Sequence, residues 1–388
     1  MTRVLMVSWE YPPVVEGGLA RHVRKLSEQL VRDGHEVHVL TRGRRPGAEE
    51  RHGVAVHRVG APDFPRADLD AFIAWVGRMN ADLLEAGGAL GGGFDVVHSH
   101  DWLVADAARG LGRPWVVTVH ATEHGRHEGR VHAHPQSLIH GAERRMARDA
   151  DRLIACSRYM RRQVVDALGV PPGRVTVVPN AIDPSDLRPL ADLPRLRARF
   201  AGPRERLLLL VGRLVYEKGF HLALDALPAL IRRVGALRFV VAGAGPAEDE
   251  LRAQARRLGL LEHGSFVGWA GDDFLHSLYR VADLCVVPSL YEPFGLVALE
   301  AMASGCPCIV AATGGLREVV PGGRRVGLRF RARDPRSLAR MAEQLLSDDA
   351  LRDRLVAEAG EWVLRFDWAD VARQTVEVYA DLRGARVS

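Results

Sequence analysis

The feature that most constrains the fold is an apolar run followed directly by a turn and a helical pattern, around residue 290. Residues 284–287 are all apolar, as expected for a buried strand. The turn contains Pro293 and Gly295, and residues 296–303 have a helical pattern. Glycine lets the backbone approach a ligand closely, and the first N–H groups of a helix can bind an anion. The segment therefore predicts a strand, a turn and a helix whose start can hold a phosphate.

Two glutamates accompany this helix start. Glu292 precedes the helix, and Glu300 lies eight residues further on, inside it. With a diphosphate on the N–H groups, the carboxylates could accept hydroxyl hydrogens from a ribose on one side and a hexose on the other. That arrangement suits a sugar nucleotide. Because glutamates at this spacing also occur by chance, the alternative is a solvated glutamate on each flank of a core helix.

The full string, E-P-F-G-L-V-A-L-E, resembles the E-P-F-G-x-x-x-x-E signature of retaining glycosyltransferases of family 4, the glycogen-synthase type. The resemblance implies the α/β GT-B fold, with two facing Rossmann-like domains, a substrate cleft between them and a C-terminal helix that returns to the first domain. It also implies that Glu292 binds the hexose as a catalytic residue and that Glu300 binds the ribose. The donor diphosphate would lie at the helix start, at Phe294, Gly295 and Leu296.

A loop near the N-terminus matches the same family. Gly17 and Gly18 follow a predicted strand at 4–8 and open a helical pattern. The double glycine alone could be a simple tight turn. It resembles the Gly-Gly-Leu loop of glycogen-synthase-like enzymes, which implies that both glycines bind the donor. The loop holds Glu16-Gly17-Gly18 rather than the Lys-x-Gly-Gly of the main bacterial glycogen synthases, so the donor base stays open between UDP and ADP.

Two further sites lie where predicted strands end, and ligands of open α/β sheets bind at such ends. Asp101 follows a predicted strand at 94–98, in a segment similar to the H-x-H-D-W of glycogen synthases. The resemblance implies that Asp101 faces the sugar and acceptor; the alternative is a cap for the next helix. His120 ends the strand at 115–119, and by resemblance it contacts the donor sugar as a catalytic residue. The polar loop 121–130 is expected to reach the acceptor.

A basic loop follows the predicted strand at 207–211. Arg213 and Lys218 lie on this loop and could clamp a diphosphate. The segment G-R-L-V-Y-E-K-G resembles the family's G-R-L-x-x-x-K-G, whose Arg and Lys hold the leaving diphosphate. Two solvated cations are the alternative. By resemblance, Arg213 and Lys218 are catalytic.

No motif predicts a metal or a cofactor. The triplet 68–70 is formally D-x-D, but it opens a helical pattern, and Asp68 is interpreted as a helix cap. The histidines between 120 and 134 lack the H-E-x-x-H spacing and have no cysteine or aspartate cluster nearby. The sugar nucleotide is thus expected as a substrate in a site without a metal ion.

The chain has 388 residues, which favours two domains. We predict an N-terminal acceptor domain at 1–183, a linker rich in Pro and Arg at 184–203, a nucleotide-sugar-binding domain at 204–366 and a returning helix at 367–388. The glycine-rich run 87–93 is interpreted as a flexible connector.

The net charge of +5 suits anionic ligands. No helix-turn-helix, finger or aromatic-interleaved pattern predicts nucleic-acid binding, while weak peripheral contact with an acidic membrane stays open. No apolar run is long enough to span a bilayer, and the N-terminus lacks the shape of a secretory signal. Four cysteines without a C-x-x-C pair are expected as buried thiols in a cytoplasmic protein, at 156, 285, 306 and 308.

The expected function is transfer of glucose from UDP-glucose or ADP-glucose to an α-1,4-glucan or oligosaccharide. The opening W-E-Y-P-P and the loop after His120 favour a relation to bacterial α-1,4-glucosyltransferases. A mannosyl- or other hexosyltransferase with a lipid or small-molecule acceptor is one alternative. A sugar-nucleotide 2-epimerase on the same fold is another, and a catalytically silent glucan-binding protein is the third.

Overall fold

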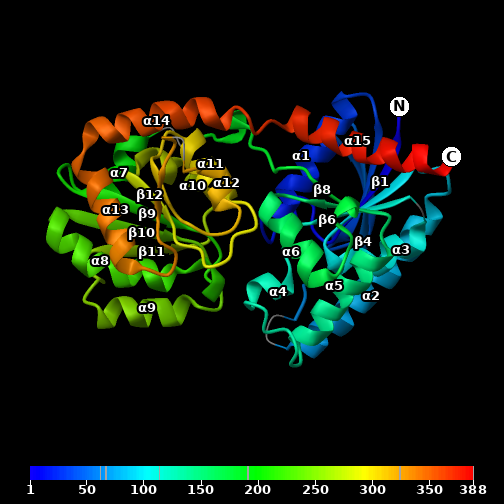
Figure 1. The fold of residues 1–388 in the computed structure, drawn as a ribbon, viewed down its shortest axis with the longest axis horizontal. Helices are drawn as coiled ribbons and strands as arrows, with labels where there is room; N and C mark the ends of the chain where they lie inside the picture. Colours follow the sequence, from blue (N-terminus) through cyan, green and yellow to red (C-terminus); the bar gives the residue numbers. More distant parts are fainter. Residues whose placement is uncertain (62, 66–67, 113, 190–191, 323–324, 388) are drawn as a thin grey trace. The chain divides into compact units, whose positions relative to one another are not determined.

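The computed structural model describes residues 1–61, 63–65, 68–112, 114–189, 192–322 and 325–387. Contacts divide the chain into two compact units (Figure 1). Unit 1 comprises Met1–Ala181 and Asp367–Ser388, and unit 2 comprises Ile182–Phe366.

Unit 1 is built on an eight-stranded sheet with the order β3-β4-β2-β1-β5-β6-β7-β8 among the described residues. All neighbouring pairs are parallel except β3–β4. Because central parallel strands are buried on both faces, β1 and β6 are nearly continuous apolar runs. The strands are β1 Arg3–Ser8, β2 Glu36–Gly43, β3 Gly47–Arg51, β4 Val54–Gly60, β5 Val96–His100, β6 Trp115–Val119, β7 Arg152–Ala155 and β8 Val175–Val177.

The last helix of the chain completes the core of unit 1. It packs against the first helix, and Tyr379 lies in one apolar cluster with Val4 and Leu26. The predicted return of the C-terminal helix to the first domain is thus confirmed. The helices are α1 Gly18–Arg32, α2 Leu69–Ala89, η1 Trp102–Val104, α3 Ala105–Leu111, α4 Glu123–Arg126, α5 Gln136–Asp149, α6 Arg158–Leu168, η2 Pro172–Arg174 and α15 Trp368–Val387.

Unit 2 contains a six-stranded parallel sheet with the order β11-β10-β9-β12-β13-β14. Helix α8 packs with α9 and α13, and α10 packs with α7 and α11. The strands are β9 Arg206–Val211, β10 Leu237–Ala242, β11 Gly264–Gly268, β12 Leu284–Val287, β13 Cys308–Ala311 and β14 Leu328–Phe330. The helices are η3 Pro184–Asp186, α7 Leu193–Phe200, η4 Tyr216–Lys218, α8 Phe220–Val234, α9 Glu248–Arg257, α10 Asp272–Val281, α11 Leu296–Ala303, α12 Leu316–Val319, α13 Pro335–Ser347 and α14 Asp349–Val363.

Two sequence predictions in unit 1 need correction. The run 87–93 is not simply a connector, because α2 continues through Gly87 to Ala89. Gly87 is buried, and a Cβ there would lie 2.5 Å from a methyl carbon of Leu111, so this glycine allows close packing. Strand β5 begins and ends two residues later than predicted. His100 therefore belongs to the strand rather than to the following loop.

The predicted linker at 184–203 is only partly irregular. It contains η3 and the helix α7, and Leu196 of α7 is buried. Arg197 of the same helix donates to Asp283 across 2.8 Å. This segment therefore belongs to unit 2 as packed structure.

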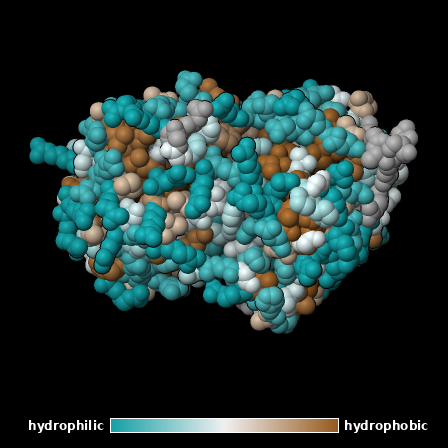
Figure 2. Space-filling model, in the orientation of Figure 1, coloured by the Kyte–Doolittle hydropathy of each residue, from teal (hydrophilic) through white to brown (hydrophobic). Residues whose placement is uncertain are grey.

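The surface is mainly hydrophilic and the cysteines are buried, as expected from the sequence. Figure 2 shows one face on which hydrophilic residues predominate and hydrophobic residues form separate patches. Among the described residues, no helix has the length and apolar content needed to cross a membrane. All four cysteines are buried thiols that form no disulfide. Burial raises the pKa of the Cys308 thiol to about 12, so it stays protonated and unreactive.

Candidate active site

The candidate site of unit 2 lies where β9 and β12 end side by side. The strands pair in parallel, with Leu210 opposite Val286, so the loops that follow them meet at one edge of the sheet. The carbonyl oxygen of Glu217 accepts hydrogen bonds from the N–H groups of Leu290 and Tyr291, at 2.8 and 3.2 Å. Backbone hydrogen bonds thus hold together the two loops that carry the predicted residues.

Lys218 and Glu292 meet at this junction. The Lys218 ammonium donates to Oε2 of Glu292 across 2.8 Å, and the Ser289 hydroxyl donates to the same oxygen across 3.1 Å. The Glu292 side chain is only 11% exposed, so the ion pair is screened little by solvent. Two residues far apart in sequence are therefore joined, whereas Ser289 had no signal of its own in the sequence.

Gly219 makes this junction possible. It has φ +68°, and a Cβ at this position would overlap the carbonyl oxygen of Pro288. A glycine is required both by the backbone conformation and by the space. The short distance between Lys218 and Glu292 depends on this close approach of two backbones.

Arg213 lies on the same loop but is more open. Its side chain is 51% exposed, and Nη2 lies 3.9 Å from Oε1 of Glu217. Such a weak, exposed pair leaves a guanidinium able to exchange partners at low cost. The Arg213 side chain is therefore more exposed than that of Lys218, which is 21% exposed and pairs with Glu292.

The start of α11 is formed by a glycine rather than by a capping side chain. Gly295 has φ +122° and makes no side-chain cap. A Cβ there would lie 2.7 Å from Leu316, so the position is restricted to glycine. The neighbouring loop is held close, because the N–H of Gly315 donates to the carbonyl oxygen of Glu292 across 2.8 Å. Phe294 is buried and Leu296 is half-buried at this helix start.

Glu300 projects from α11 toward α10. It is 9% exposed, and the Tyr279 hydroxyl donates to Oε2 of Glu300 across 2.9 Å. Tyr279 is fully buried, so its hydroxyl fixes the orientation of the carboxylate. Sequence analysis could not identify this partner, because Tyr279 occupies an apolar helix position.

In unit 1, Asp101 and His120 are joined at the ends of β5 and β6. The Asp101 carboxylate accepts the backbone N–H of His120 across 2.7 Å. Asp101 does not cap the next helix, so that alternative is wrong. Burial raises the pKa of Asp101 to about 6. Hydrogen bonds from the N–H groups of His120 and Ala121 lower the pKa and so partly offset the effect of burial. Asp101 has φ +60°, a strained conformation for a residue with a side chain.

The glycine loop at the start of α1 has an internal acceptor. Oε2 of Glu10 accepts the N–H groups of Glu16 and Gly17, at 2.6 and 3.1 Å. Burial raises the pKa of Glu10 to about 7. Gly17 has an extended backbone, with φ −175°, and no atom lies within 4 Å of a Cβ added there. The backbone therefore does not require glycine at 17, while Gly18 is the first residue of α1.

Glu16 has a structural partner that explains its presence. Its Oε1 lies 2.8 Å from Nη2 of Arg42, a side chain only 2% exposed. Nε of Arg42 donates to the carbonyl oxygen of Trp9 across 3.0 Å. The Arg42–Glu16 pair thus ties the glycine loop to β2, a role that the sequence analysis missed.

The polar loop after His120 contains the short helix α4, which Thr122 caps by accepting the N–H of Gly125 across 3.0 Å. Glu143 of α5 also anchors α4, by accepting the N–H of Glu123 across 2.7 Å. Burial raises the pKa of Glu143 to about 8. The loop is therefore anchored rather than freely mobile, by a carboxyl group that is neutral near pH 7.

A cluster of three histidines lies beside this loop. His22 of α1, His100 of β5 and His120 each offer a ring nitrogen, and these atoms lie within 4.8 Å of one another. His22 was missed, although it occupies the buried face of α1 between Leu19 and Leu26. Burial lowers the pKa of His120 to about 4.

Asp68 of the D-x-D triplet caps α2, as predicted, by accepting the N–H of Ala71.

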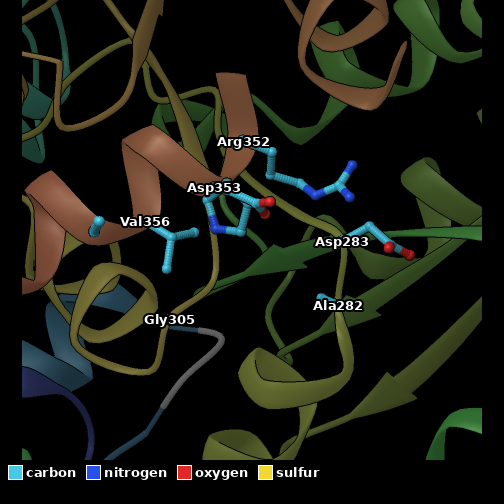
Figure 3. A pocket seen from close by; sticks show the side chains of 8 residues that line it. Ala282, Asp283, Gly305, Arg352, Asp353 and Val356 are labelled. Atoms are coloured by element: carbon cyan, nitrogen blue, oxygen red, sulfur yellow. The ribbon is translucent and has the colours of Figure 1, made fainter. Parts of the chain in front are cut away.

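One pocket of unit 2 lies away from these residues (Figure 3). Its volume is about 360 Å³, and Asp283, Gly305 and Arg352 line it. Asp283 precedes β12, and Pro307 of the same pocket precedes β13. The pocket is therefore at the amino ends of the strands, whereas the predicted site residues are at the carboxyl ends.

Comparisons with known proteins identify relatives of the whole chain. A family model described as Glycosyltransferase Family 4 matches residues 16–186, and one described as Glycosyl transferases group 1 matches residues 196–362. A glycogen synthase from Mycobacterium tuberculosis is 40% identical over 405 residues, covering 99% of this chain and 96% of that protein. A D-inositol 3-phosphate glycosyltransferase from Frankia alni is 36% identical and covers 94% of each.

Solved structures give the fold. Sucrose-phosphate synthase from Thermosynechococcus elongatus matches with a TM-score of 0.82 at 25% identity, covering 99% of this chain and 100% of that chain. In this chain, each of the two α/β units is built on a largely parallel sheet. The predicted GT-B fold class is thus confirmed.

Proposed function

Because the chain belongs to the family 4 glycosyltransferases and is glycogen-synthase-like, we propose that it transfers glucose from UDP-glucose or ADP-glucose to an α-1,4-glucan, with retention of configuration. Use of a sugar nucleotide follows from the family; the donor, the acceptor and the stereochemistry are the proposal. The glycogen synthase relative, 40% identical over nearly the full length, supports the choice of glucose and glucan.

The observation that carries the proposal is the Lys218–Glu292 ion pair at 2.8 Å, next to the start of α11. Arg213, Lys218 and the N–H groups of α11 stabilise the negative charge that develops on the departing diphosphate. Glu292 binds hexose hydroxyls and lies near the positive anomeric carbon. Since Lys218 is already paired, it also holds the Glu292 carboxylate in place.

The remaining predicted residues have binding roles in the proposal. Glu300, oriented by Tyr279, accepts hydrogen bonds from the ribose hydroxyls. Asp101 and His120 bind the transferred sugar and the acceptor. The acceptor hydroxyl attacks from the face that the diphosphate leaves, and a diphosphate oxygen takes its proton. No step in this scheme needs a metal ion.

The test is release of nucleoside diphosphate from a panel of sugar nucleotides, with and without glycogen or a maltooligosaccharide, in the presence of a chelator. We expect release from a glucose donor only when glucan is present, and an α-linked product by NMR. Release without any acceptor, or only from another hexose donor, would overturn the proposal. Isomerisation of the donor without release would instead indicate the 2-epimerase.

The site is tested by a matched pair of variants. Glu292→Gln removes the charge that pairs with Lys218 and should lower kcat at least 10²-fold. Glu262→Gln changes an exposed glutamate of the same unit and should leave kcat unchanged. Unchanged turnover in Glu292→Gln would remove Glu292 from the reaction.

A second candidate differs only in the acceptor. The D-inositol 3-phosphate glycosyltransferase relative, 36% identical over 94% of each chain, supports a small phosphorylated acceptor. The same release assay separates the two, with inositol phosphates and sugar phosphates in place of glucan. Release that depends on a phosphorylated acceptor and not on glucan would select this candidate.

A further inference from the structure

A pocket of unit 1 lies between α4 and α6. Its volume is about 230 Å³. Strands β6 and β7 pair in parallel, so the loop that carries α4 and the start of α6 lie at the same edge of the sheet as His120. None of the side chains of this pocket takes part in the proposed transfer step. The lining residues are His124 of α4 and Tyr159, Arg162, Gln163, Asp166 and Ala167 of α6.

The two walls of the pocket are tied together. The Thr122 hydroxyl, which caps α4, donates to Oε1 of Gln163 in α6 across 3.2 Å. Glu143 of α5 holds α4 as well, through the N–H of Glu123. Because the amide oxygen of Gln163 is engaged, its NH₂ group is the part left to donate to a ligand. The pocket is therefore formed before a ligand binds, and binding needs little ordering of the protein.

Two opposite charges line the pocket without a protein partner. Arg162 and Asp166 are both exposed and lie one helical turn apart, a spacing at which opposite charges commonly pair. Among the residues that the structure describes, neither side chain forms a hydrogen bond or an ion pair, with the other or with a third residue. A guanidinium that only donates and a carboxylate that only accepts are therefore both open to a ligand.

Tyr159 gives the pocket an aromatic wall. It is half-buried, and burial raises the pKa of its hydroxyl, which therefore stays protonated near neutral pH. The C–H face of a sugar ring packs on an aromatic ring, while the hydroxyl groups at its rim reach donors and acceptors. One aromatic side chain with a few placed polar groups is the usual composition of a small-ligand site.

The combination selects a neutral ring that is rich in hydroxyl groups. The charges of Arg162 and Asp166 cancel, so the pocket favours neither a phosphate nor a cation. Each hydroxyl both donates and accepts, so one sugar ring can satisfy both side chains. The volume is below the roughly 300–1,000 Å³ of pockets that enclose a drug-sized ligand, which suits a single ring. We propose that this pocket binds one glucose unit of an α-glucan acceptor, away from the unit that reacts.

The inference rests on the proposed function in one respect, the identity of the acceptor as an α-glucan. An acceptor chain that occupies both the reacting position and this pocket is held at two points, which raises its affinity. The pocket should therefore control how the KM for the acceptor depends on chain length. The KM for the sugar nucleotide should not depend on it.

The kinetic test uses a double variant of the pocket, Arg162→Gln with Asp166→Asn. Both side chains are exposed, so the fold should tolerate the change. We expect the KM for maltoheptaose to rise at least about tenfold, with kcat and the KM for the donor unchanged. Arg145→Gln with Asp82→Asn, at exposed positions of the same unit, is the control and should leave all three constants unchanged. An unchanged KM for maltoheptaose in the pocket variant would overturn the inference.

Binding without a donor separates failure of this inference from failure of the proposed function. Full-length protein is titrated with maltoheptaose in a calorimeter, and the pocket variant should bind at least about tenfold more weakly than wild type. That result supports the pocket even if diphosphate release proves not to need glucan. Equal affinity of wild type and pocket variant, or no binding to either, would overturn the inference even if release does need glucan.

Discussion

Glu143 makes the stability of unit 1 dependent on pH. Its side chain is 3% exposed, and Oε1 accepts the N–H of Glu123 across 2.7 Å. Burial raises its pKa from 4.5 to about 8; Arg126 lowers the pKa, while Glu123 and Asp101 raise it. Nδ1 of His140 lies 3.7 Å from Oε2. We predict that Glu143→Gln, which keeps the acceptor oxygen and cannot ionise, removes this dependence.

The sign follows from proton linkage. Between pH 4.5 and about 8 the folded state holds a proton on Glu143 that the unfolded chain has lost. The stability that Glu143 contributes is therefore complete below pH 4.5 and is lost as the pH rises toward 8. Each pH unit costs up to about 1.4 kcal/mol. Between pH 5 and pH 8, wild type should lose about 3–4 kcal/mol relative to Glu143→Gln.

The assay is urea unfolding followed by tryptophan fluorescence at several pH values. Five of the seven tryptophans belong to unit 1, at 9, 75, 102, 115 and 368, so the signal reports mainly on that unit. Subtracting the free energies of unfolding of the two proteins at each pH cancels the contributions of the other titrating groups. Glu85→Gln, at an exposed position of α2, is the control and should give a flat difference. A flat difference for Glu143→Gln as well would refute the reasoning, because Glu143 would then be ionised in the folded protein.

Two further predictions concern the site, and two concern the stability of the fold. Tyr279→Phe removes the hydroxyl that donates to Glu300, and should raise the KM for the donor roughly tenfold or more with little change in kcat, measured in the diphosphate-release assay. Arg213→Ala should lower kcat roughly 10²-fold in the same assay, if the guanidinium stabilises the leaving group. Gly243→Ala should lower the free energy of unfolding by about 2 kcal/mol or more, because φ is +151° and a Cβ would overlap a backbone carbonyl oxygen. Gly17→Ala, with open space around it, should change stability by less than about 1 kcal/mol in the same urea titration.

The fold of unit 2 was predictable because its signals are local. The strand at 284–287 and the helix at 296–303 were predicted with the bounds that the structure has. The apolar run is followed by Pro288, and the helix is preceded by Gly295, which leaves little choice for the end of the strand and the start of the helix. The pairing of Lys218 with Glu292 could not be predicted from local signals, because it depends on β9 and β12 being neighbours in the sheet.

The partners of the site residues were harder to predict than the residues. Tyr279 and His22 both lie on apolar helix faces, where a sequence pattern indicates only burial. The continuation of α2 through Gly87 was missed because glycine normally weakens a helix. In that case close packing against Leu111 outweighs the propensity, and packing of this kind is visible only in three dimensions.

The loop at Gly17 and Gly18 limits where the donor charge can be bound. A diphosphate would compete with Glu10 for the N–H groups of Glu16 and Gly17. The positive charge of Arg42 is likewise taken by Glu16. In unit 2, by contrast, the Arg213 side chain is 51% exposed, and α11 starts at Gly295 without a side-chain cap. The proposed clamp on the diphosphate therefore rests on unit 2. Because Val15 stands at the lysine position of Lys-x-Gly-Gly, the Arg213–Lys218 loop must supply that positive charge.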